Sequence, residues 1–81
     1  MHHYKEYVIR LNGLDLGQLI DGLEARATAW RLTAIYLETG LAPDGFVIEE
    51  CDDAEEAGRI AEHYQRVLGT ILKQQADQRD R

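Results

Sequence analysis

The chain has 81 residues and a formal net charge of −6, so it can hold one small hydrophobic core and is expected to fold as a single domain over residues 1–81. Its 44% hydrophobic and 30% charged residues exclude a largely disordered chain. No apolar run approaches the roughly 18 residues that span a membrane, and the N-terminus lacks the order of a secretory signal, so a cytoplasmic location is expected.

Cysteine and charge usage narrow the possible partners. Cys51 is the only cysteine, so we expect a fold held by packing in a reducing compartment. Residues 41–62 hold eight acidic side chains and a single basic one. Nucleic-acid binding depends on clustered Lys and Arg, and the sequence has no such cluster, which disfavours a nucleic-acid partner.

The N-terminal region predicts a strand. Tyr7, Ile9 and Leu11 alternate with Glu6 and Arg10, a period of two that is typical of a half-buried strand over residues 7–11.

The extreme N-terminus gives little guidance to the fold. Residues 1–3 are expected to be disordered. His2 and His3 fit a native terminus and the remnant of an added tag equally well.

A long helix is predicted over residues 12–39. Asn12 is a candidate N-cap, although a start at Asp15 fits the sequence equally well. Gly40, followed by Pro43, marks the expected end.

This helix carries two apolar stripes. The first faces the expected core and comprises Leu16, Leu19, Ile20, Leu23, Ala27, Trp30, Ala34 and Leu37. The second lies roughly opposite and comprises Ala25, Ala29, Leu32 and Tyr36. A chain of this length has too few elements to cover both stripes, so the second stripe predicts a homodimer interface.

The second half of the chain predicts a short strand or extended segment at residues 46–50 and a second helix at residues 53–75, with a disordered end at 76–81. The helices should pack antiparallel, with Trp30 against Tyr64 and Leu68. The predicted fold is therefore α+β and mainly helical: a strand, a long helix, a short strand or extended segment, and a second long helix, with the two helices as an antiparallel hairpin.

Four acids beside the second helix form a candidate patch for a basic protein partner: Glu49, Glu50, Asp52 and Asp53. Asp52 or Asp53 is also expected to cap the helix. The acids do not follow the spacing of a calcium-binding loop, and no metal or cofactor site is predicted. Cys51 is interpreted as a buried structural residue and His63 as a boundary residue.

Three classes of function remain open. The first is a small homo-oligomeric interaction or regulatory module that acts through helical faces and the acidic patch, and every strong signal in the sequence is a packing signal of this kind. The second is a nucleic-acid-linked regulator of ribbon-helix-helix type, suggested by a strand that leads into helices. The third is an enzyme or ligand binder with a site at an oligomer interface, although no catalytic constellation is visible.

Overall fold

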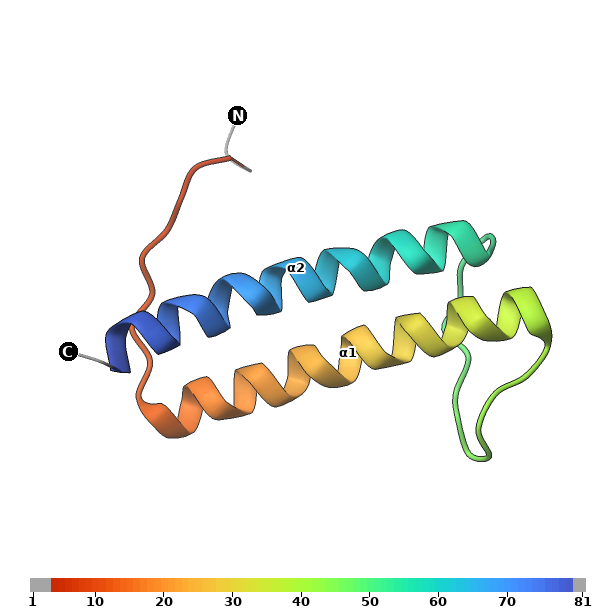
Figure 1. Cartoon of the computed structure of the whole chain (residues 1–81), viewed down its shortest axis with the longest axis horizontal. Coiled ribbons are helices and arrows are strands. Elements are labelled where there is room, and N and C mark those ends of the chain that lie inside the picture. Colours follow the sequence, from red (N-terminus) through yellow and green to blue (C-terminus); the bar gives the residue numbers. More distant parts are fainter. Residues whose placement is uncertain (1–3, 80–81) are drawn as a thin grey trace.

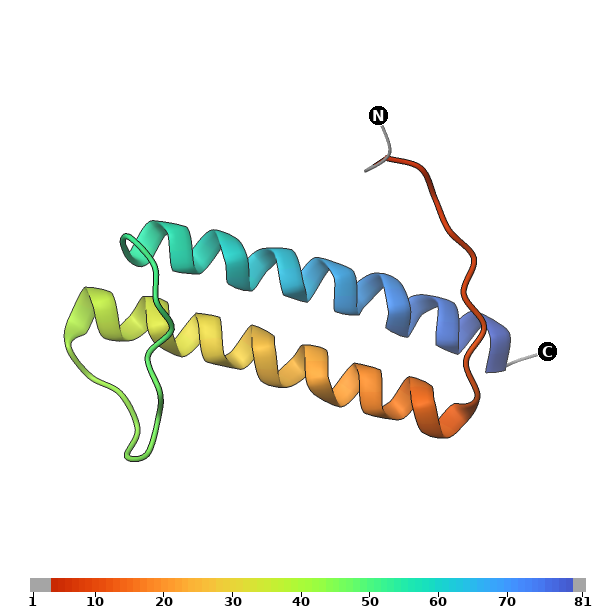
Figure 2. The same ribbon diagram turned by 180° about the vertical axis from the view of Figure 1, so that it is seen from behind.

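A computed structural model describes residues 4–79, and within them the regular secondary structure consists of two α-helices, α1 (Gly13–Thr39) and α2 (Ala54–Arg79). The helices lie side by side and run in opposite directions (Figure 1; seen from behind in Figure 2). The chain measures 47 × 34 × 17 Å along its principal axes, so its thinnest dimension is little more than one layer of helix with its side chains. The predicted helical hairpin is confirmed.

Both ends of α1 are fixed by local capping. The Asn12 side chain accepts a hydrogen bond of 2.8 Å from the Asp15 backbone N–H, which decides between the two predicted starts in favour of Asn12. At the other end Gly40 has φ +76° and donates its backbone N–H to the Tyr36 carbonyl at 2.7 Å. A left-handed residue at this position is most easily supplied by glycine.

Helix α2 begins at its predicted cap and ends later than predicted. The Asp53 carboxylate accepts a hydrogen bond of 2.8 Å from the Glu56 backbone N–H. The helix passes the predicted end at Gln75 and continues to Arg79, because this stretch contains no glycine or proline and is rich in good helix formers. Residues 1–3 and 80–81, for which disorder was also predicted, lie outside the described residues.

Residues 4–79 contain no strand. The strand predicted at residues 7–11 is therefore corrected to an extended segment, and residues 46–50 form the extended segment that was the alternative to a strand there. Residues 7–11 lie at the end of the hairpin where α1 begins and α2 ends, whereas residues 46–50 lie near the opposite end (Figure 1). A strand requires a second backbone beside it. The two segments are too far apart to provide this for each other.

The core between the helices is small. Its buried apolar residues are Ile20, Ala27 and Trp30 on α1 and Ala57, Ala61 and Leu68 on α2. Trp30 packs in one cluster with Ala57 and Ala61, and Tyr64 packs against this cluster. The predicted packing of Trp30 is therefore confirmed for Tyr64, while Leu68 is buried outside this cluster. Leu19 and Leu37, which belong to the predicted core stripe of α1, remain exposed, as does Leu72 of α2.

Candidate functional site

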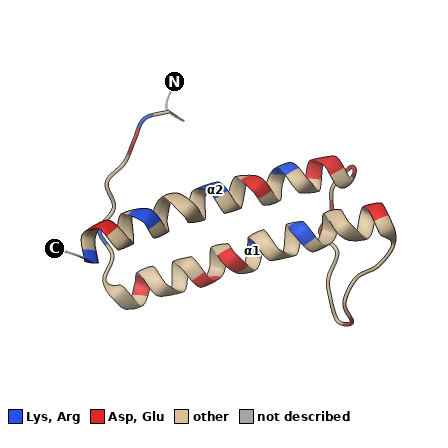
Figure 3. Ribbon diagram, viewed as in Figure 1, with Lys and Arg blue, Asp and Glu red and all other residues tan. Residues whose placement is uncertain are grey.

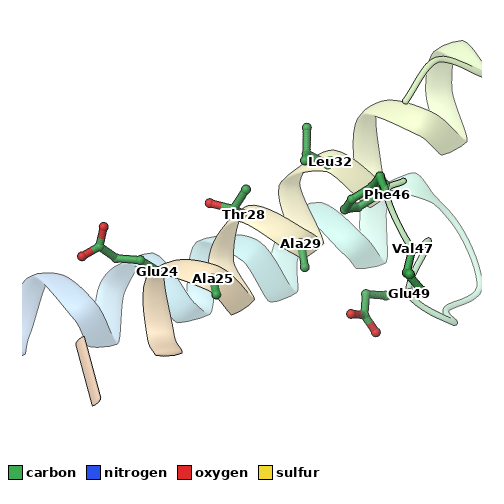
Figure 4. Close-up of a pocket in the computed structure, with 8 residues that line it drawn as sticks. All are labelled: Glu24, Ala25, Thr28, Ala29, Leu32, Phe46, Val47 and Glu49. Atoms are coloured by element: carbon green, nitrogen blue, oxygen red, sulfur yellow. The ribbon is translucent and has the colours of Figure 1, made fainter. Parts of the chain in front are cut away.

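An open groove of about 500 Å³ lies between α1 and the loop that returns toward α2 (Figure 4). We call it the α1 groove. Its lining residues are Glu24, Ala25, Thr28, Ala29 and Leu32 from α1 and Phe46, Val47 and Glu49 from the loop. On the viewed face of α1, Thr28 and Leu32 lie toward one edge, and Ala25 and Ala29 lie toward the other (Figure 4). Most of the surface between these two rows is apolar.

The α1 groove contains three of the four residues predicted for the dimer interface. Ala25, Ala29 and Leu32 all line it, while Tyr36 lies one turn farther along α1 and is exposed outside the lining. The loop adds Phe46 and Val47, which the second stripe of α1 did not include. Val47 is 75% exposed, so its apolar side chain is open to an incoming surface.

Thr33 holds the loop against α1 and was missed as a structural residue by the sequence analysis. It is fully buried. Its hydroxyl donates to the Ala29 carbonyl at 2.8 Å and accepts the Glu49 backbone N–H at 3.1 Å. A buried hydroxyl needs such partners, and Thr33 thereby positions one wall of the α1 groove. In the sequence, Thr33 could be recognised only as a β-branched polar residue next to the core stripe. This position did not reveal that the loop would cover Thr33.

Arg26 provides a second link between α1 and the loop. Its guanidinium donates to the Glu49 carboxylate at 2.9 Å and lies 5.8 Å from the Trp30 ring centroid and 6.0 Å from that of Tyr64. Hydrogen bonding to the Tyr64 side chain and to Glu49 raises the pKa of Arg26. A permanently charged group therefore joins the loop, the core tryptophan and α2.

These contacts divide the predicted acidic patch. Glu49 is half-buried and paired with Arg26, and Asp53 caps α2. Glu50 and Asp52 are exposed and form no hydrogen bond or ion pair with another described residue. Acidic residues cluster where the loop enters α2 (Figure 3), and of the four only Glu50 and Asp52 are exposed without a partner among the described residues.

Cys51 occupies a sheltered position beside the core. It is half-buried, packs against the Trp30 cluster and lies with its Sγ 3.6 Å from the Asp53 carbonyl. Burial, together with the nearby Glu56 carboxylate, raises the pKa of the Cys51 thiol, so the reactive thiolate is disfavoured. Cys51 is half-buried and not fully buried as predicted, and it does not end a strand; its structural role stays a prediction.

His63 lies on the exposed face of α2, away from the groove. Its Nδ1 is 2.8 Å from Arg66 Nη2. Within residues 4–79, no three His, Cys, Asp or Glu side chains come together in a group that could hold a metal ion.

Comparison with known proteins gave no relatives: no family model matches the chain, and no curated protein or solved structure matches it significantly. Neither of the two described helices is long and apolar enough to cross a membrane.

Proposed function

We propose that this chain is a small cytosolic interaction module that self-associates through the α1 groove and performs no catalysis of its own. The observation that carries the proposal is the apolar lining of this groove, where small α1 side chains meet the exposed side chain of Val47. A single layer of two helices cannot shield such a surface by itself. The single half-buried thiol is consistent with a reducing, cytosolic setting.

The groove suits a second copy of the same hairpin. Ala25 and Ala29 are one helical turn apart, and small residues at this spacing allow two helix backbones to approach closely. A two-fold axis near Ala29 would bring Leu32 of each chain against the Phe46 and Val47 wall of the other. Covering several hundred Å² of apolar surface per chain would contribute several kcal/mol before association entropy is subtracted, at ~25 cal/mol per Å².

The exposed acids suggest how the module could also engage a basic protein. Glu50 and Asp52 lie outside the α1 groove lining, so a cationic partner could contact them while the groove is occupied. Such binding should weaken as salt rises, because exposed charges are screened. Charge reversal at Glu50 and Asp52 should abolish it and leave the Arg26–Glu49 pair intact.

Substitution of Leu32 tests the proposal. Leu32→Asp would place two carboxylates in the apolar interface, and we expect the dimer to weaken by about a hundredfold or more. Leu41→Asp is the matched control, because Leu41 is exposed in the loop and lies outside the groove lining. Light scattering after size-exclusion chromatography should show smaller particles for Leu32→Asp alone. Equal masses for the parent and both variants would overturn the proposal.

A further inference from the structure

We infer that residues 5–11 pair with the same segment of a second copy as an antiparallel two-stranded ribbon centred on Val8. This interface lies at the end of the hairpin where α1 begins and α2 ends, away from the α1 groove (Figure 1). The inference goes beyond the proposed function and does not depend on it.

The backbone of this segment is unpaired in the single chain. Residues 5–11 have no backbone hydrogen bond to any other described residue, and the first such bond of this region joins the Leu16 N–H to the Asn12 carbonyl. Val8 is 92% exposed and Ile9 76%. An extended run rich in β-branched and aromatic residues with free amides and carbonyls is well suited to pair with another strand.

The two faces of the segment differ in character. Tyr7, Ile9 and Leu11 border a hollow of about 280 Å³. Its other lining residues are Leu16 and Leu19 of α1 and Ile71, Gln74, Gln75 and Gln78 of α2. Glu6, Val8 and Arg10 alternate with them along the chain. A ribbon that keeps this apolar face toward the helices would extend the small core of each hairpin, because residues two apart in a strand share one face.

Charge complementarity selects the register. With the two-fold axis at Val8, Glu6 of each copy lies opposite Arg10 of the other, and Tyr7 lies opposite Ile9. Moving the centre to Ile9 places Arg10 opposite Val8 and Glu6 opposite Asn12. Of these two registers, the Val8 register alone pairs opposite charges twice on one face, while the other face pairs Tyr7 with Ile9 and Lys5 with Leu11. Opposite-charge pairs and aromatic pairs with β-branched residues both stabilise antiparallel strands.

The ribbon and the groove require different two-fold axes. Val8 precedes α1, whereas Ala29 lies about 24 Å into that helix at 1.5 Å per residue. An axis near Ala29 therefore separates the two copies of Val8 widely. If both interfaces form, each chain contacts two neighbours and the assembly is larger than a dimer, and each interface can be removed without the other.

A cysteine placed on the proposed axis tests the pairing. Residues directly opposite each other in antiparallel strands have Cα atoms about 4.5 to 5.5 Å apart, which a disulfide can bridge. In a Cys51→Ser background, Val8→Cys should form disulfide-linked dimers under mild oxidation. Leu41→Cys, exposed in the distant loop, should form few. Equal cross-linking of both variants would overturn the inference.

Charge exchange tests the register in the same cross-linking assay. Glu6→Arg alone and Arg10→Glu alone each place like charges opposite one another twice, so each should reduce Val8→Cys cross-linking by about tenfold. An equal mixture of these two proteins should restore it, because every arginine then faces a glutamate. Failure of the mixture to restore cross-linking would exclude the Val8 register. Leu32→Asp should leave cross-linking unchanged, so the ribbon and the groove are tested separately.

Discussion

Thr33 shows how one buried hydroxyl can determine the shape of a surface. Replacing it with valine keeps the shape and leaves the Glu49 backbone N–H without its partner, since Thr33 is the residue that accepts it. We expect Thr33→Val to lower the free energy of unfolding by about 1 to 3 kcal/mol. Thr70→Val is the control, because Thr70 makes the same hydrogen bond to its own helix, to the Arg66 carbonyl, and none to the loop.

Chemical denaturation of these two variants checks the role of Thr33. The control should stay within about 0.5 kcal/mol of the parent. Equal unfolding free energies for Thr33→Val and Thr70→Val would show that the loop does not depend on Thr33.

The Cys51 thiol gives the fold a dependence on alkaline pH. Burial and the Glu56 carboxylate raise the pKa of this thiol, so the folded state favours its protonated form. The resulting stabilisation is fully present below the ordinary thiol pKa of about 8.5 and is lost as pH rises through the higher folded pKa. The Tm values of the parent and of Cys51→Ser, measured in thermal melts, should therefore converge or cross above about pH 8.5. A Tm difference independent of pH would contradict this assignment.

At the start of helix α2, an acid that caps the helix lies next to an acid that does not. Asp53→Ala removes the hydrogen bond to the Glu56 N–H and should destabilise the protein by about 1 kcal/mol. Asp52→Ala removes the same charge at the adjacent position, where no hydrogen bond is lost. This variant should change the stability of the protein little. Circular dichroism melts of the two variants give the comparison. Equal destabilisation would mean that charge near the helix end matters and the specific cap does not.

The helices could be predicted from sequence because the signals that end them are local. Asn12, Gly40 and Asp53 each act on a backbone group within four residues, so spacing along the chain reveals them. The strand at residues 7–11 could not be settled in this way. Its alternating pattern is clear, but a strand exists only beside another backbone, and the described chain places none there.

The candidate site could be predicted only in part, because spacing along the chain reveals one wall of it and not the other. The period of α1 placed Ala25, Ala29 and Leu32 on one stripe, and all three line the groove. The opposite wall, formed by Phe46 and Val47, depends on how the loop folds back, which periodicity does not report. The sequence did not show that Glu49 of the predicted acidic patch pairs with Arg26, 23 positions away.

The whole molecule is thin for a folded domain, and the expected self-association follows from this thinness. Among residues 4–79, six buried apolar residues form a small core, while large apolar side chains remain exposed in the N-terminal segment, the loop and both helices. Small domains with limited cores often gain stability from association. We therefore expect folding and self-association to be coupled, so that the Tm of the parent rises with protein concentration.

Sedimentation equilibrium of the parent protein, from about 1 µM to about 1 mM, tests whether the chain self-associates, because this range covers weak and moderate dissociation constants. We expect a weight-average mass that reaches at least twice the 9.2 kDa of a single chain. A mass that stays at 9.2 kDa over the whole range would contradict both the groove interface and the ribbon.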